Sequence, residues 1–269
     1  MEIDLLTTER LEIRDVGLEE MDHLINLCIP PDRRDDPLFI EGMKEKRRWA
    51  AQLIERYGSI AKLAYLDSKP MGLIQYQPLL GDRLVEITCI FVPEEENLRK
   101  GIGRSLLKAL MKEMNEVKPF FNNKPPLAFV TWAFQVPGRY PQHEFYRRIG
   151  FKRMREENPF FLYYPLEEGY VHRPKRGEFI PQEEDRGKAL IFYDPSCPFC
   201  IYFSEVIKRA IRKVAPEIPV RTINMFEESE EAKKRGQVPF CAVNGRPIQA
   251  SFMDRENFQR EVREALTPP

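Results

Sequence analysis

The sequence has little of what marks membrane, nucleic-acid-binding and repeat proteins. No apolar run approaches the ~20 residues that a membrane-spanning helix requires. Lysine plus arginine and aspartate plus glutamate both number 42, so no net charge attracts nucleic acid or an anionic membrane. The sequence shows no internal repeat or low-complexity tract, and histidine occurs only three times. These absences favour a globular protein whose partners are neither nucleic acids nor membranes.

The amino terminus, Met-Glu-Ile-Asp, lacks the basic and apolar segments of a secretory signal, so we expect a cytoplasmic location. Thiols stay reduced in that compartment. A close pair among the five cysteines is therefore expected to serve redox or metal chemistry rather than a structural disulfide. At 269 residues, with 42% hydrophobic residues, the chain is long for one core and suits two domains.

Hydrophobic periodicity predicts a mixed α/β first half. Strands are expected where apolar residues alternate with polar ones or where β-branched and aromatic residues cluster, and helices where apolar residues recur every three or four positions. The predicted strands are 9–16, 59–66, 71–78, 84–92, 127–134, 151–154 and 159–166, and the predicted helices are 17–27, 40–57, 101–117 and 141–148.

A charged segment with prolines and glycines then predicts a linker. Beyond it the pattern predicts strands at 189–193, 220–225, 238–243 and 246–249, and helices at 201–215, 228–235 and 255–266. Asn244-Gly245 is a hairpin signal between the last two strands. We therefore expect a first domain at 1–168, a linker at 169–187 and a second domain at 188–269.

A glycine loop joins the strand 84–92 to the helix that follows. Gly101 and Gly103 let the backbone approach a ligand closely, and the N–H groups of a first helical turn attract anions. Arg99, Lys100 and Arg104 add positive charge at the same place. The loop therefore predicts a binding site for a phosphate or pyrophosphate group.

Three stretches resemble the GNAT superfamily of acetyl-CoA-dependent N-acetyltransferases: Val92-Pro93-Glu94, the glycine loop with Leu106 and Leu107, and His-Glu-Phe-Tyr-Arg-Arg-Ile-Gly-Phe at 143–151. The likeness covers residues 8 to 166. Leu98 stands where the family's loop usually has Gln or Arg, and Arg99 follows one residue later. The resemblance implies a mixed, mostly antiparallel central sheet flanked by helices. It also implies acetyl-CoA as the cofactor and a small-molecule or peptide amine as the acceptor.

The resemblance further implies which residues hold the cofactor. Backbone amides of the loop would bind the pyrophosphate, and unpaired backbone groups where the fourth and fifth strands splay apart would pair with the pantetheine arm. The expected cofactor-binding residues are Ile90, Phe91, Val92, Arg99, Lys100, Gly101, Ile102, Gly103, Arg104 and Ser105.

Glu86 is the candidate general base, because an amine nucleophile must lose a proton to a carboxylate within reach. Strict alternation along the strand would put Glu86 on the same face as Thr88, Ile90 and Val92. Some family members place a base at this position. The competing interpretation is a solvated residue near a strand end.

Tyr146 is the candidate general acid. In the Phe-Tyr-x-x-x-Gly-Phe context the family often uses this tyrosine to protonate or steady the departing CoA thiolate. A phenol of pKa about 10 suits a thiol leaving group of pKa about 8.5. The competing interpretation is an aromatic side chain packed on the sheet.

Cys197-Pro198-Phe199-Cys200 lies between a predicted strand and a predicted helix. A helix N-terminus stabilises a thiolate, and the spacing lets the second thiol attack a mixed disulfide formed by the first. With the downstream Val238-Pro239, the motif resembles the thioredoxin/glutaredoxin fold over residues 187 to 267. That family's Val-Pro peptide is usually cis and faces the cysteine pair, so Cys197, Cys200 and Pro239 are the expected thiol-site residues.

Two alternatives remain open for this motif. Cys241 could join the pair in a site for a soft metal such as zinc, copper(I) or mercury(II), although alternation would aim its side chain at the core. The motif could also be retained without activity. No metal site is assigned.

The whole arrangement resembles GNAT proteins that end in a YoaP-like, thioredoxin-like domain. The expected function is transfer of acetyl from acetyl-CoA to a primary amine, with a dithiol domain that recruits a thiol-bearing partner or exerts redox control. The alternative is a thiol-disulfide oxidoreductase, or a redox- or metal-sensing module, with a CoA-binding N-terminal domain.

Overall fold

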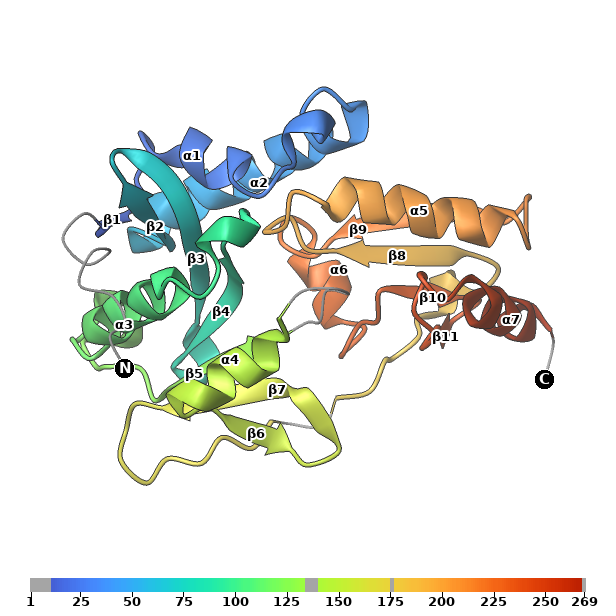
Figure 1. Cartoon of the computed structure of the whole chain (residues 1–269). Helices are drawn as coiled ribbons and strands as arrows, with labels where there is room; N and C mark the ends of the chain where they lie inside the picture. The colour runs from blue at the N-terminus through green and yellow to red at the C-terminus, as the bar shows by residue number, and fades with distance from the viewer. Residues whose placement is uncertain (1–10, 134–139, 175–176, 268–269) are drawn as a thin grey trace. The chain divides into compact units, whose positions relative to one another are not determined.

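The computed structural model describes residues 11–133, 140–174 and 177–267. Contacts divide the chain into two units: Met1–Pro30 with Ala50–Pro174, and Pro31–Trp49 with Lys175–Pro269. Each unit contains one sheet (Figure 1). Residues 31–49 thus group with the C-terminal unit, while the boundaries 1–168, 169–187 and 188–269 stay a prediction. No helix in the described ranges has the length and hydrophobicity needed to cross a membrane.

The N-terminal unit is built on a seven-stranded sheet of order β1-β2-β3-β4-β5-β7-β6. Every neighbouring pair is antiparallel except β4 and β5, which run parallel. The mixed, mostly antiparallel sheet is therefore confirmed. Residues 9, 10 and 134, at the ends of two predicted strands, lie outside the described residues. The strands are β1 (Leu11–Asp15), β2 (Ala61–Leu66), β3 (Lys69–Leu79), β4 (Leu84–Phe91), β5 (Ala128–Trp132), β6 (Lys152–Arg155) and β7 (Asn158–Pro165).

Helices α3 (Ile102–Met114) and α4 (Gln142–Ile149) pack on one face of this sheet. Their apolar side chains share a core cluster with Val85 and Ile87 of β4, so the helix predicted over 101–117 packs an apolar face on the sheet. The helix ends at Met114, earlier than predicted, and Val117 is 60% exposed beyond it. The unit also contains α1 (Met21–Asn26) and residues 50–57 of α2 (Pro37–Tyr57).

A β-bulge interrupts β4 at Thr88. Gln75 of β3 lies opposite Cys89 and Tyr76 lies opposite Ile87, so Thr88 is an extra residue in the β4 strand. An extra residue shifts the alternation of side chains by one position. The faces of β4 before and after Thr88 are therefore exchanged.

The C-terminal unit is built on a four-stranded sheet of order β11-β10-β8-β9. β8 and β9 run parallel, and β10 is antiparallel to both β8 and β11. Asn244 and Gly245 have φ of 52° and 74°, as a tight turn between β10 and β11 requires, so the predicted hairpin is confirmed. The strands are β8 (Ala189–Tyr193), β9 (Val220–Asn224), β10 (Cys241–Val243) and β11 (Arg246–Pro247).

Helices α5 (Cys200–Arg212) and α7 (Arg255–Leu266) supply apolar residues to one core cluster of this unit, and α6 (Ser229–Lys233) follows β9 (Figure 1). Ile207 and Val262 from the two helices pack with Ile191 of β8. Residues 37–49 of α2 belong to this unit. The helix begins at Pro37, a residue suited to the first helical position, and the carboxylate of Asp36 accepts the N–H of Leu38 at 3.0 Å.

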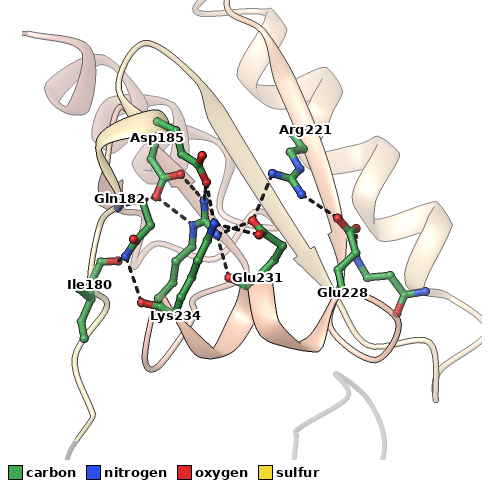
Figure 2. Close-up of polar contacts among 10 residues, drawn as sticks. Ile180, Gln182, Asp185, Arg221, Glu228, Glu231 and Lys234 are labelled. Atoms are coloured by element: carbon green, nitrogen blue, oxygen red, sulfur yellow. Dashed lines mark hydrogen bonds and ion pairs between the residues drawn. The ribbon is translucent and has the colours of Figure 1, made fainter.

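A buried ion cluster joins the predicted linker to α6. The side chain of Arg235 has no exposed surface and donates to both carboxylate oxygens of Asp185, at 3.0 and 2.6 Å. Glu184 and Glu231 accept from the same guanidinium at 2.9 and 3.1 Å. Figure 2 shows Asp185 and Glu231 gathered at this cluster, and Arg221 beside Glu228. The end of the predicted linker is therefore an integral part of the C-terminal unit.

Candidate functional site

The glycine loop ends in a helix N-terminus with three uncommitted backbone donors. Arg99 and Gly101 have φ of 64° and 81°, and α3 begins at Ile102. All residues of this helix are described, and its first hydrogen bond runs from the Ser105 N–H to the carbonyl oxygen of Gly101, at 2.9 Å. The N–H groups at 102, 103 and 104 therefore have no acceptor inside the helix, as an anion site requires.

Positive charge surrounds these donors. Arg99, Lys100 and Arg104 are exposed, and no acidic residue lies in the first turn of α3. Lys100 Nζ donates to Oδ1 of Asn97 at 3.3 Å. Asn97 is only 4% exposed, and its Nδ2 group has no hydrogen-bond partner among the described residues. Asn97 was not among the predicted site residues, because nothing in the local pattern distinguishes a buried asparagine from an exposed one.

The ladder between β4 and β5 ends close to this helix. Within the described residues their ladder runs from Leu84–Ala128 to Ile87–Thr131. Beyond it β4 continues beside β3 as far as Phe91, while Trp132 of β5 pairs with β7. A Cβ atom at Gly103 would contact Ile90 Cδ1 at 3.7 Å, so the α3 N-terminus adjoins β4 beyond the last β4–β5 pair. The parallel pairing of the fourth and fifth strands thus ends where the expected opening would begin.

The backbone carbonyl group of Ile90 was expected to be unpaired. Its oxygen accepts a hydrogen bond from Nε2 of Gln142, at 3.1 Å, so this backbone group is not unpaired. Gln142 is the first residue of α4 and was not among the predicted site residues. A glutamine at a helix start carries no signal in sequence that it will reach across to a strand. Phe91 and Val92 are half-buried, and their cofactor contacts stay a prediction.

Tyr146 lies at the last β4–β5 pair. Its side chain is 1% exposed and packs against Phe145 and Phe151, with ring centroids 5.3 and 4.8 Å away. Burial raises the pKa of Tyr146, and a hydrogen bond with the Thr131 side chain opposes that rise. Thr131 in turn donates to the Ile87 carbonyl oxygen at 2.9 Å. The phenol therefore keeps its proton in the neutral range, as a general acid must.

The prediction that Glu86 shares a face of β4 with Ile90 is wrong. Glu86 pairs directly with Val130, which belongs to the core cluster of the opposite sheet face from Ile90. The bulge at Thr88 causes the exchange, because alternation counted from Val92 back to Glu86 ignores the extra residue. Glu86 is half-buried and accepts from Nε2 of Gln77 at 2.8 Å. The base and acid candidates therefore approach the strand opening from opposite faces.

The two cysteines of the motif differ in exposure. Cys197 is exposed in the loop after β8, and Cys200 is the 5% exposed first residue of α5. The Cys200 N–H donates to the Cys197 carbonyl oxygen at 3.1 Å, which forms a tight turn between them. Burial, followed by the neighbouring Cys197, raises the pKa of Cys200. Cys197 is thus the accessible thiol and Cys200 the sheltered one.

One expectation for this site is corrected, and one of the two open alternatives is not supported. No peptide bond among the described residues is cis, so Val238–Pro239 is trans, as X–Pro bonds are by a small intrinsic preference. Cys241 lies in the core of the unit, where burial raises its pKa to about 12. The described residues contain no group of three or more His, Cys, Asp or Glu that could hold a metal ion, so the three-cysteine metal site does not form.

A family model for the Acetyltransferase (GNAT) family matches residues 18–151. No curated protein sequence matches the chain. A solved structure of PaiA N-acetyltransferase from Thermoplasma acidophilum, in complex with coenzyme A, is 20% identical with a TM-score of 0.43, and the match covers 58% of this chain and 98% of that one. Ard1 from Thermoplasma volcanium is 12% identical with a TM-score of 0.41, over 59% and 99% of the two chains.

A GNAT family acetyltransferase from Brucella melitensis, solved in complex with acetyl-CoA, is 15% identical with a TM-score of 0.39, over 58% and 88% of the two chains. The segment that the family model matches contains β4, the glycine loop, α3 and α4. These elements form the glycine loop and the end of the β4–β5 ladder. Residues 18–151 of this chain are therefore an acetyltransferase domain of the GNAT family.

Proposed function

We propose that the chain transfers an acetyl group from acetyl-CoA to a primary amine of a small molecule or peptide. The observation that carries this proposal is the opening between β4 and β5 beside the uncapped N-terminus of α3. The N–H groups of residues 102–104 and the charges of Arg99, Lys100 and Arg104 suit a diphosphate. Acetyl-CoA supplies an acetyl group already activated as a thioester.

The reaction also requires two proton transfers. Glu86, directly or through one water, accepts the proton that the attacking amine must lose. Tyr146 donates its phenolic proton to the thiolate that departs when the new C–N bond replaces the C–S bond. Their placement on opposite faces of the sheet keeps the two proton transfers apart. Gln142 and Thr131 hold the Ile90 and Ile87 carbonyl groups at the opening.

Charge reversal at the start of α3 tests the cofactor site. In Arg104→Glu, a carboxylate replaces a cation within the first helical turn, so the Kd for acetyl-CoA is expected to rise about tenfold or more. The matched control is Lys108→Glu, the same change at an exposed position one turn along the helix. Titration calorimetry measures both. Wild-type protein that takes up no acetyl-CoA would overturn the proposed transferase, and equal weakening by both variants would overturn the assigned diphosphate site.

Glu86→Gln tests the base. The amide keeps the shape of the side chain and can still accept from Gln77, but it cannot take a proton, so kcat/KM is expected to fall about 100-fold near neutral pH. Glu116→Gln, at an exposed position beyond the C-terminal end of α3, makes the same chemical change far along the chain from the glycine loop and should leave kcat/KM unchanged. A steady-state assay that detects acetylated product by mass makes the comparison. Unchanged turnover in Glu86→Gln would return this residue to the role of a solvated strand residue.

We propose further that the C-terminal unit is a thioredoxin-like dithiol module. Three observations support it: the sheet order β11-β10-β8-β9, the motif between β8 and α5, and an exposed Cys197 before a buried Cys200. Such a module would recruit a thiol-bearing partner or control the transferase by its redox state. The exposed thiol also favours thiol-disulfide exchange as a second candidate function of the chain.

A further inference from the structure

Helix α2 contributes a face to the dithiol site within the C-terminal unit. Phe39, Gly42 and Lys46 follow one another at spacings of three and four residues, so they share that face. The Phe39 ring lies 4.9 Å from the ring of Phe199, inside the cysteine motif, and stacks on Tyr202 at 5.1 Å. This part of α2 therefore packs directly on the motif and on the first turn of α5.

Gly42 allows this close approach. A Cβ atom at this position would overlap the carbonyl oxygen of Pro198, the residue after Cys197. Helical glycine is otherwise unfavourable by about 1 kcal/mol relative to alanine. Its place here is explained by the contact between the helix and the motif loop.

One turn beyond Gly42, Lys46 is buried with 1% of its surface exposed. A buried ammonium group needs a compensating charge or hydrogen-bonding partners. Asp194, three residues before Cys197, supplies a negative charge: burial raises the pKa of Asp194, and the positive charge of Lys46 acts to lower it. The Asp194 carboxylate also accepts the backbone N–H of Ser196 at 2.8 Å. Asp194 thus begins the loop that carries the motif, and Lys46 is buried on the helix face that packs on this loop.

Among the described residues, two carboxylates act on the cysteine pair. Glu45 of α2 is 8% exposed and accepts from Asn224 of β9 at 2.9 Å and from Arg48 at 3.1 Å. Arg48 also donates to Glu227 at 3.0 Å. Burial raises the pKa of Tyr193 to about 12, so this phenol carries no charge near neutral pH. Glu45 and Asp194 both act against ionisation of the Cys200 thiol. Lys46 brings a buried positive charge to the face of α2 that packs on the motif.

We infer that Lys46 is a positioning residue of the dithiol site: buried on the face of α2 that packs on the motif loop, its positive charge opposes the negative charge of Asp194 and so favours the Cys197 thiolate. The inference rests on the thiol-disulfide exchange proposed above. In that exchange the Cys197 thiolate attacks one sulfur of a partner disulfide, whose S–S bond breaks and releases a thiolate that takes a proton from water. Cys200 then loses its proton and attacks Cys197 Sγ, which releases the second partner thiol. The partner is reduced by two electrons, and the cysteine pair is oxidised to a disulfide.

The test is the pH profile of Cys197 alkylation by iodoacetamide. In a Cys200→Ser background, cleavage after Lys188 and Lys208 gives a peptide that contains Cys197 as its only thiol. Lys46→Met is expected to raise the midpoint of the profile by about one pH unit, since one unit is a tenfold change in thiolate population. Asp194→Asn is expected to lower the midpoint, because it removes the opposing negative charge. General damage to the fold would not move the two variants in opposite directions.

The matched control is Lys44→Met, which removes a lysine from the same helix at an exposed position where it pairs with Glu41 at 3.1 Å. Its midpoint should equal that of the parent. A common midpoint for Lys46→Met and Lys44→Met would overturn the inference. If Lys46→Met does not fold, the Asp194→Asn variant decides. An unshifted midpoint in Asp194→Asn overturns the inference, and a lowered midpoint supports it.

Alkylation needs no disulfide partner, so this result is independent of the proposed exchange. That exchange is tested separately with the wild-type chain and a glutathione mixed disulfide. Wild type should reduce the mixed disulfide and Cys197→Ser should not. No reduction by wild type would overturn the exchange while leaving the charge effect on Cys197 measurable.

Discussion

Replacing Tyr146 with phenylalanine is expected to lower kcat about 100-fold while acetyl-CoA binding stays close to that of wild type. A positioned general acid contributes about 10²–10⁴-fold to a rate, and only the hydroxyl group is lost. The ring keeps its packing against Phe145 and Phe151. Because burial raises the pKa of Tyr146, the phenol stays protonated across the neutral range, so the loss should not depend on pH there.

Tyr76→Phe is the matched control for this variant. Tyr76 is 2% exposed in the same core cluster, and its hydroxyl contacts Glu113 at 3.3 Å, away from the strand opening. The control should show wild-type kcat even if its stability falls slightly. Turnover is measured by intact-mass detection of acetylated product, because a thiol reagent would also react with the protein's own cysteines. Equal kcat values for the two variants would remove Tyr146 from the mechanism.

The largest loss of stability is expected from Arg235→Met. The variant leaves Asp185, whose side chain is 1% exposed, as a buried carboxylate without its main partner. Removing one partner of a buried ion pair costs about 3–5 kcal/mol. For a unit of this size, that loss corresponds to a fall of roughly 10–20 °C in the melting temperature of the C-terminal unit, measured by scanning calorimetry.

Arg221→Met makes the same change on the surface. Arg221 is 43% exposed and pairs with Glu228 at 2.7 Å and with Glu231 at 3.3 Å, so its loss should cost under about 1 kcal/mol. It shares Glu231 with Arg235 and differs from it in burial. Equal melting temperatures for the two variants would show that burial does not decide the strength of this cluster.

The cluster also predicts a pH dependence. Hydrogen bonds from Lys234 and then Arg235 lower the pKa of Glu231 to about 2. Burial acts to raise the pKa of Asp185, but the hydrogen bonds from Arg235 and the Gln182 N–H outweigh it, and the net shift is downward. A lowered folded-state pKa stabilises the fold above the unfolded value, near 4, and that stability is lost as the pH falls toward 2. The difference between wild type and Arg235→Met should therefore shrink over this range.

Local patterns predicted most of the elements. The apolar stripe of α3, the glycine loop and the Asn244-Gly245 turn depend on residues close together in the chain, and each lies where the sequence indicated. The motif Cys197–Cys200 was likewise placed correctly between a strand and a helix. Such features are readable because periodicity and turn chemistry act over a few residues.

The pairing of distant strands could not be predicted from the sequence. The bulge at Thr88 exists only because β3 lies opposite β4 with one residue fewer, and it reverses the face of Glu86 relative to Ile90. Likewise, β5 pairs with β7 rather than with β6, the next strand along the chain. Register depends on contacts across the sheet, which a single strand's alternation does not encode.

The sequence by itself determined the glycine loop before a helix and the place of the Cys197–Cys200 motif between a strand and a helix, because both follow from short runs of glycine, charge and helix-start residues. Only the tertiary structure buried Lys46 and Arg235 and brought Arg235 to Asp185. A lysine or arginine in a helical pattern is normally solvated. Whether it is buried depends on which distant carboxylate the fold brings to it, and that is decided by packing over the whole unit.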